Sequence, residues 1–115
     1  MRPEASKPSS ESKIHVVVFP RGEWLIAQCL EYDIATRARL SEGFTGLRHE
    51  VERILAVHIL GARREGSEPF ANIPKAPKRF WEMYKDASVR LEPVRDGGLE
   101  LPADTPRPVL ELRAA

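Results

Sequence analysis

Apolar side chains in the first part of the chain alternate with the period of a β-strand in two adjacent stretches. Residues 14–19 (IHVVVF) and 23–30 (EWLIAQCL) are separated by a Pro-Arg-Gly break, which predicts two strands joined by a short turn. Both faces of the second strand are mostly apolar, one with Trp24, Ile26, Gln28 and Leu30 and the other with Leu25, Ala27 and Cys29. A sheet with one solvated face would alternate more cleanly. Another helix, the C-terminal segment or a partner subunit should therefore cover the second face.

A third strand and a long helix are predicted next. Residues 34–39 (IATRAR) fit a strand with one solvated, basic face near a sheet edge. Apolar residues then recur at helical spacing, which predicts an amphipathic helix lying across the sheet: Phe44, Leu47, Val51, Ile54 and Leu55. Ser41 is the expected N-cap of this helix, and Gly61 is its expected end.

The second half of the chain predicts a connection, a short helix and an extended arm. Phe70 and Ile73 should anchor the connection at residues 62–77, and a helix over residues 77–88 carries an aromatic stripe. Short strands are expected at residues 99–101 and 109–112. The prolines between them suggest that residues 92–115 form an arm that packs on a second copy of the chain.

Composition limits the class of protein without naming a function. The chain has 115 residues and a formal net charge of +1, which indicates one domain with no overall attraction to nucleic acid or acidic lipid. Residues 1–12 are polar and should form a disordered tail before a domain at residues 13–91. Its single cysteine, the lack of a signal-like apolar region and the lack of a membrane-length apolar run suggest a cytoplasmic protein.

The run from Trp24 to Thr36 (WLIAQCLEYDIAT) resembles a motif of the HicB-like family. Family members show an aromatic-led strand similar to W-x-A-x-C-L-E, followed by Y-D-I-A-T-Q-G and a helix. Arg37 and Ala38 stand where Gln-Gly is usual, and Gly43 stands where the helix usually has Ala. The resemblance is strongest over residues 13–58.

The resemblance implies a partly degenerate RNase H-like fold, with a small antiparallel sheet of three to four strands and a helix across one face. It also implies a small RNA-cleaving toxin as a partner. Many members carry a C-terminal DNA-binding module, but residues 77–115 show no pair of consecutive short helices of the helix-turn-helix kind. The chain is therefore more similar to solitary members of the family.

Candidate catalytic and metal-binding residues are few. Glu31 and Asp33 could hold a cation in a residual metal-dependent nuclease, although the first strand supplies no further carboxylate and a solvated turn is the favoured explanation of the pair. Arg53 occupies the position of the second ligand in an H-E-x-x-H site that would begin at His49. Cys29 shares a face with apolar residues, which favours a buried thiol. We expect no catalytic residue, cofactor or metal.

The sequence therefore predicts an α+β, non-enzymatic protein-interaction domain. The expected interaction surface comprises Arg37, Arg39, Arg48 and Arg53, although acidic residues such as Glu50 and Glu52 interleave as on a solvated helix. The expected interface of a homo-oligomer, either a dimer or a tetramer, comprises Trp24, Phe80, Trp81 and Tyr84. RNA binding is the alternative function, and nucleic acid is a less favoured partner than protein. No membrane contact is expected.

Overall fold

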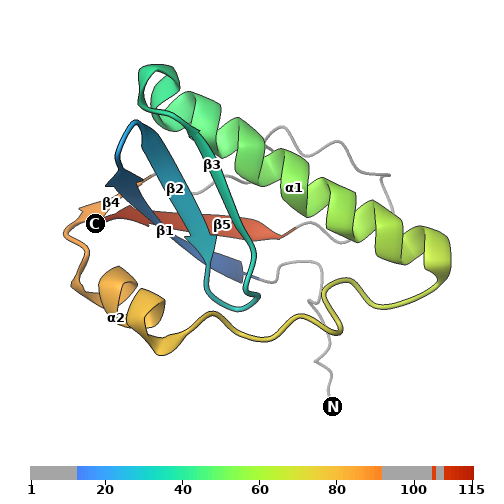
Figure 1. Ribbon diagram of the computed structural model, residues 1–115. Helices are drawn as coiled ribbons and strands as arrows, with labels where there is room; N and C mark the ends of the chain where they lie inside the picture. Colours follow the sequence, from blue (N-terminus) through green and yellow to red (C-terminus); the bar gives the residue numbers. More distant parts are fainter. Residues whose placement is uncertain (1–12, 92–104, 106–107) are drawn as a thin grey trace, which may run out of the picture.

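One mixed five-stranded sheet carries a helix on each side (Figure 1). The computed structural model describes residues 13–91, 105 and 108–115. The elements in chain order are β1 (Lys13–Arg21), β2 (Trp24–Cys29), β3 (Ala35–Arg39), a 3₁₀ turn (Leu40–Glu42), α1 (Gly43–Glu65), α2 (Lys78–Asp86), β4 (Val89–Arg90) and β5 (Val109–Ala114). The order of strands across the sheet is β3-β2-β1-β5-β4. The predicted α+β class is confirmed.

The β1–β2 hairpin turns through Gly22 and Glu23. Gly22 has a φ of +61°, a conformation that glycine adopts without steric cost. The turn pairs Arg21 with Trp24, and this pairing sets the register of both strands. β1 continues through Pro20, beyond the predicted break. Proline is tolerated there because β5 pairs with β1 only as far as Val18, so the missing N–H removes no bond to β5.

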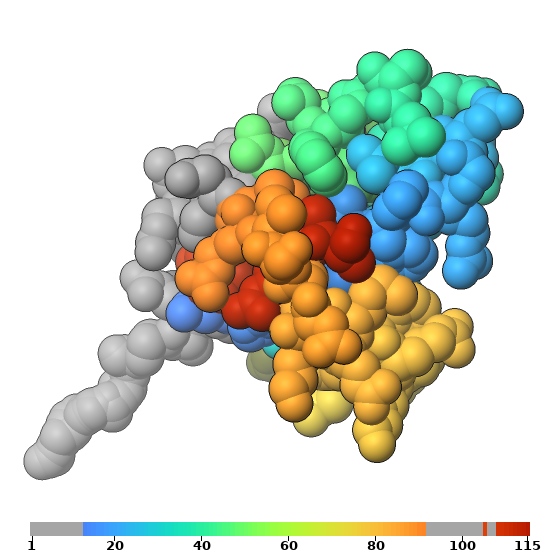
Figure 2. Space-filling view, turned by 90° about the vertical axis from the view of Figure 1, so that its left-hand side faces the viewer, coloured from blue at the N-terminus to red at the C-terminus, as the bar shows by residue number. Residues whose placement is uncertain are grey.

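The C-terminal segment is a strand inside the sheet. β5 runs parallel to β1, pairing Ile14 with Leu110, and it pairs antiparallel with β4 on its other side. Figure 2 shows the red end of β5 between the blue β1–β2 hairpin and the orange residues around β4. The predicted strand at residues 109–112 is therefore confirmed, but it belongs to the sheet and not to an arm packed on a second copy. The prediction of a purely antiparallel sheet of three to four strands was wrong, because β5 is a fifth strand and runs parallel to β1. The expected tail, the strand at residues 99–101 and most other residues of the expected arm lie outside the described residues.

α1 covers one face of the sheet and forms the larger core. Its buried residues include Leu47, Val51 and Leu55, which belong to one cluster with Val16 and Leu110. The connection after α1 is anchored as predicted, because Phe70 and Ile73 pack against this cluster.

Both predicted ends of α1 differ from the structure. Ser41 lies within the 3₁₀ turn and provides no cap, and α1 starts at Gly43. At the other end the helix passes through Gly61 and ends at Glu65, where Gly66 adopts a φ of +70°. The left-handed backbone of Gly66 lets its N–H reach the last carbonyls, which is why the helix stops there.

α2 covers part of the opposite face, which explains why both faces of the second strand are apolar. Phe80 and Tyr84 are buried against Val17 and Leu30 in a second, smaller core. The sequence left three possible covers for this face: a helix, the C-terminal segment or a partner subunit. The structure shows that the cover is the helix α2. Its coverage stops short of the turn end of the hairpin, where Trp24 and Ile26 are only half-buried.

Candidate functional site

The uncovered part of the α2 side of the sheet presents two rows of side chains from three strands. Residues that pair directly across antiparallel strands point to the same face. One row is Arg39, Trp24 and Arg21, and the next is Arg37, Ile26 and Phe19. Next come Gln28 and Val17, which are buried. The exposed rows therefore lie beside α2 at the turn end of the hairpin.

Arginine side chains stack on the aromatic rings of this region. The guanidinium carbon of Arg37 lies 4.0 Å from the ring centroid of Trp24, and that of Arg39 lies 4.8 Å from it. The Arg21 guanidinium lies 5.9 Å from the Phe19 ring. Phe19 in turn stacks on Phe80 of α2, with ring centroids 6.0 Å apart.

A fourth arginine extends this pattern onto α2, where the guanidinium of Arg79 lies 4.6 Å from the Phe80 ring. All four arginines are exposed. We use the name arginine–aromatic surface for the following set: Phe19, Arg21, Trp24, Ile26, Arg37, Arg39 and Arg79.

The charge of this surface is nearly unopposed. Glu23 lies 3.7 Å from Arg39, and both side chains are largely exposed, so the pair contributes little energy. Within the described residues, no carboxylate forms an ion pair with Arg21, Arg37 or Arg79. Stacking on an aromatic face holds a guanidinium group in place while its N–H groups stay available to acceptors. The surface is therefore pre-organised to accept anions.

The structure separates the four arginines of the predicted interaction surface. Arg37 and Arg39 alternate with Ala38, which is buried in the α1 core, so they point to the side of the sheet opposite α1. Arg48 and Arg53 are exposed residues of α1 itself, and Arg53 bonds Glu50 at 2.9 Å. Glu52, expected on the solvated face of the helix, is instead buried. The four arginines do not form one patch.

The structure also separates the residues of the predicted oligomer interface into buried and partly exposed ones. Phe80 and Tyr84 are 9 % exposed because they fill the second core of this chain. Trp81 is half-buried and donates an indole N–H bond of 3.2 Å to the Ala76 carbonyl. Trp24 belongs to the arginine–aromatic surface. The two tryptophans are therefore the members of the set that keep surface for a partner.

The two candidate carboxylates have separate protein partners. The Glu31 carboxylate accepts a bond from the His15 backbone N–H at 2.8 Å and lies 2.5 Å from the His15 Nδ1. Asp33 accepts a bond of 2.9 Å from the Gln28 side chain, and its backbone N–H donates to Pro74. The described residues contain no group of three His, Cys, Asp or Glu side chains placed to hold a metal ion.

His15 is the centre of a polar cluster that sequence reasoning missed. Its Nε2 lies 3.7 Å from Glu111, whose other carboxylate oxygen lies 3.1 Å from the Lys13 ammonium group. The bond from Lys13 lowers the pKa of the Glu111 carboxyl, and burial raises the pKa of the Tyr84 phenol, whose ring meets His15 edge-on. The hairpin register could have placed Glu31 beside His15. Glu111 comes from β5, so its position depended on a pairing that no local pattern shows.

The thiol is buried, and the two remaining histidines lie on α1. Cys29 is 2 % exposed, and burial raises its pKa to about 12, which confirms the predicted buried thiol. A thiol with so high a pKa is a poor nucleophile near neutral pH. His49 is exposed on α1, and the His58 ring lies 5.9 Å from that of Phe70.

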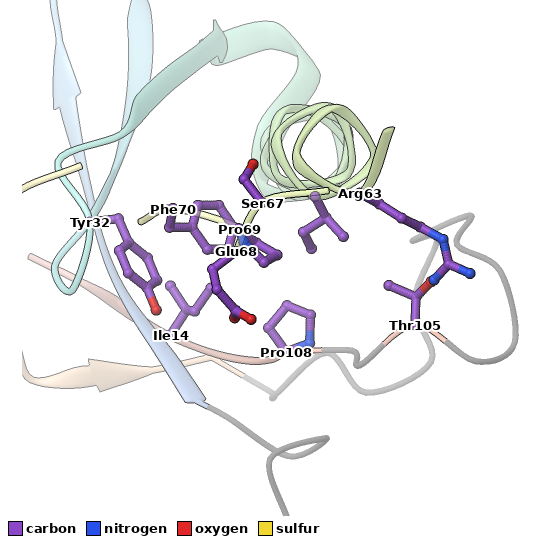
Figure 3. A pocket seen from close by; sticks show the side chains of 10 residues that line it. Ile14, Tyr32, Arg63, Ser67, Glu68, Pro69, Phe70, Thr105 and Pro108 are labelled. Carbon is purple, nitrogen blue, oxygen red and sulfur yellow. The ribbon is translucent and has the colours of Figure 1, made fainter. Parts of the chain in front are cut away.

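A pocket of about 530 Å³ opens between the C-terminal part of α1 and the start of β1 (Figure 3). Tyr32 and Phe70 stack at one side of it, with centroids 4.4 Å apart. Phe70 has a φ of +64°, which is strained for a bulky residue. On the far side Arg63 bonds Thr105 at 2.5 Å, so this arginine links α1 to the C-terminal segment.

Comparisons with known proteins add no relative. No protein-family model matches the chain, and neither a curated protein nor a solved structure matches it. The resemblance to HicB-like domains therefore stays a prediction. Within the described ranges, no helix has the length and apolar character that crossing a membrane requires.

Proposed function

We propose that the chain is a non-enzymatic, HicB-like interaction domain that binds an acidic macromolecule through its arginine–aromatic surface. The observation that carries this proposal is the stacking of Arg37 and Arg39 on the half-buried Trp24, on a face of the sheet that α2 leaves open. Exposed arginines with little carboxylate opposition attract anions, and a half-buried tryptophan provides an anchor that loses little entropy on binding. The two features together are typical of a binding surface.

A toxin-neutralising role would place restrictions on the toxin. The predicted interaction surface combines arginines of β3 and α1, but the exposed side of β3 faces away from α1, so one toxin surface cannot contact both sets directly. A toxin bound at Arg37 and Arg39 would need an acidic patch, because a basic RNA-binding face would be repelled. The proposal therefore favours an acidic contact region on any protein partner.

The homo-oligomer is a second part of the proposal, and it uses a different surface. Two copies that met through Arg37 and Arg39 would bring like charges together, which is unfavourable. Trp81 of α2 and the exposed Phe44 of α1 belong to helices on opposite sides of the sheet, and each offers a separate contact that avoids this repulsion. Light scattering tests the oligomer directly. A mass of two or four times the 13.0 kDa chain supports it, and a 13.0 kDa particle at high concentration contradicts it.

The binding surface can be tested with a pair of charge-matched variants. Arg37→Ala/Arg39→Ala removes two charges from the arginine–aromatic surface, and Arg48→Ala/Arg53→Ala removes two from the outer side of α1. Each variant changes the formal net charge from +1 to −1. On a heparin column, the first variant should elute at clearly lower salt than the wild type, and the second should elute close to the wild type.

Because the two variants have the same net charge, a difference in their elution reports the position of the lost charges. Non-specific ion exchange depends on total charge, so it would shift both variants equally. Equal elution of the two variants would contradict the proposed surface. Circular dichroism checks that both variants are folded, which is expected because all four side chains are exposed.

A further inference from the structure

We infer that the acidic macromolecule is a single strand of nucleic acid, whose bases stack on the planes of the arginine–aromatic surface while its phosphates bind the arginines. This inference rests on the proposed function and names the partner class of the same site. The sequence suggested nucleic-acid binding as a less favoured alternative, through arginines of the third strand and of the first helix and its end, and the structure places these arginines on different sides of the sheet. The inference depends instead on the arginines and aromatic rings that the structure brings together.

Planar groups of arginine and tryptophan alternate across the sheet. Arg39, Trp24 and Arg21 form one row across three strands, and Trp24 already holds two guanidinium groups at stacking distance. Aromatic rings and guanidinium planes on a sheet are the surfaces on which proteins stack unpaired bases. Every base has a flat face, so such a surface binds single strands with little sequence preference.

The size of the surface suits a short stretch of single strand. Neighbouring strands lie about 4.8 Å apart, so a row across three strands spans about 10 Å. Stacked bases repeat every ~3.4 Å, and the row therefore accommodates two or three bases, as on other sheet surfaces that bind RNA. The second row adds Arg37, Ile26 and Phe19. Beside it lies α2, where the Arg79 guanidinium stacks on the Phe80 ring.

A single strand differs from other acidic partners in the groups that it can contact on this surface. An acidic peptide would pair with the arginine charges but would gain nothing from the exposed planes of the row. A duplex presents phosphates, but its bases are stacked internally and cannot stack on the exposed guanidinium groups that lie over Trp24. Only an unpaired strand uses both the charge and the planar groups.

The inference can be tested by fluorescence anisotropy with labelled probes and the full chain. The probes are oligouridine RNA and oligothymidine DNA of about 12 nucleotides, a duplex of the same length and polyglutamate. If the four arginines each contact a phosphate, the slope of log affinity against log salt is about −2.8 for a single strand. The affinity should then fall about 50-fold between 50 and 200 mM salt.

Three variants separate stacking from charge. Arg37→Lys/Arg39→Lys keeps both charges but removes the guanidinium planes, so single-strand affinity should fall at least about fivefold with little change in the salt slope. Arg37→Ala/Arg39→Ala should also reduce the salt slope by about 1.4. Arg48→Ala/Arg53→Ala is the matched control and should bind like the wild type.

The outcomes distinguish this inference from the proposed function. Tighter binding of either single-stranded oligonucleotide than of the duplex supports the inference. The oligonucleotide with the higher affinity then shows whether the surface prefers RNA or DNA. Binding of polyglutamate without the oligonucleotides overturns the inference and leaves the proposed function standing. Wild-type affinity in the lysine variant, or equal binding of the duplex, also overturns the inference. Failure of all four probes contradicts both.

Discussion

Truncating Leu110 tests whether the C-terminal segment is an integral part of the sheet. Leu110 lies in β5, pairs with Ile14 of β1 and is 0 % exposed in the α1 core. Leu110→Ala removes a fully buried side chain and leaves a cavity that strands hydrogen-bonded on both sides cannot easily close. An arm packed on another copy of the chain would leave the stability of the single domain almost unchanged by the same substitution.

The expected loss is large for a domain of this size. Leu→Ala substitutions in buried cores cost about 2–5 kcal/mol, and the complete burial of Leu110 suggests about 3 kcal/mol. Unfolding entropy scales with chain length, so each kcal/mol lowers the Tm of a 115-residue chain by about 4 °C. Leu110→Ala should therefore lower the Tm by about 12 °C.

Urea unfolding followed by circular dichroism measures the free-energy change. Leu40→Ala is the matched control, because it makes the same substitution at a residue that is 46 % exposed, and its cost should stay below about 1 kcal/mol. A cost for Leu110→Ala no larger than that of Leu40→Ala would show that β5 does not form part of the core.

Two further predictions concern a helix glycine and the buried thiol. Gly61→Ala should stabilise the protein by about 1 kcal/mol in thermal unfolding, because Gly61 lies inside α1 with open space for a methyl group. Gly46→Ala is its control and should show no such gain, because a Cβ there would lie 2.6 Å from the Glu42 Cβ, and an equal gain at both sites would refute the packing argument. Cys29, with its pKa raised from 9.0 to about 12, should react with a thiol reagent about a thousandfold more slowly in the folded than in the urea-unfolded chain near pH 8. The folded-state rate should rise about tenfold per pH unit, and similar rates in the two states would contradict the burial.

Local patterns in the sequence were enough to predict β1, β2, β3 and both helices. Their apolar periods are set by neighbours within a few residues, and Gly22 marks the hairpin turn. The same patterns predicted the buried Cys29 and the two apolar faces of β2. The ends of α1 were less predictable, because the helix passes through Gly61 when nothing forces that residue out of helical geometry.

The position of β5 could not be predicted in the same way. Its partner β1 lies at the other end of the chain, and prolines at 102, 106 and 108 gave the segment the pattern of an arm. The His15 cluster depends on Glu111 of β5 and was missed for the same reason.

The candidate site shows the same limit. The sequence identified Trp24, Arg37 and Arg39, but it assigned the tryptophan to one surface and the arginines to another. Only the register of β2 and β3 places the three side chains together, because it sets Arg39 opposite Trp24 and Arg37 opposite Ile26. Arg48 and Arg53 were grouped with them on charge alone.

Chemical-shift mapping of the chain with the tightest-binding acidic probe locates the binding surface most directly. The proposed function predicts that the indole N–H of Trp24 and the backbone amides of Ile26 and Arg37 show the largest changes. It also predicts that the amides around Arg48 and Arg53 change little. The largest changes on the outer side of α1, or small changes spread evenly over the chain, would contradict the claim that the arginine–aromatic surface is the binding site.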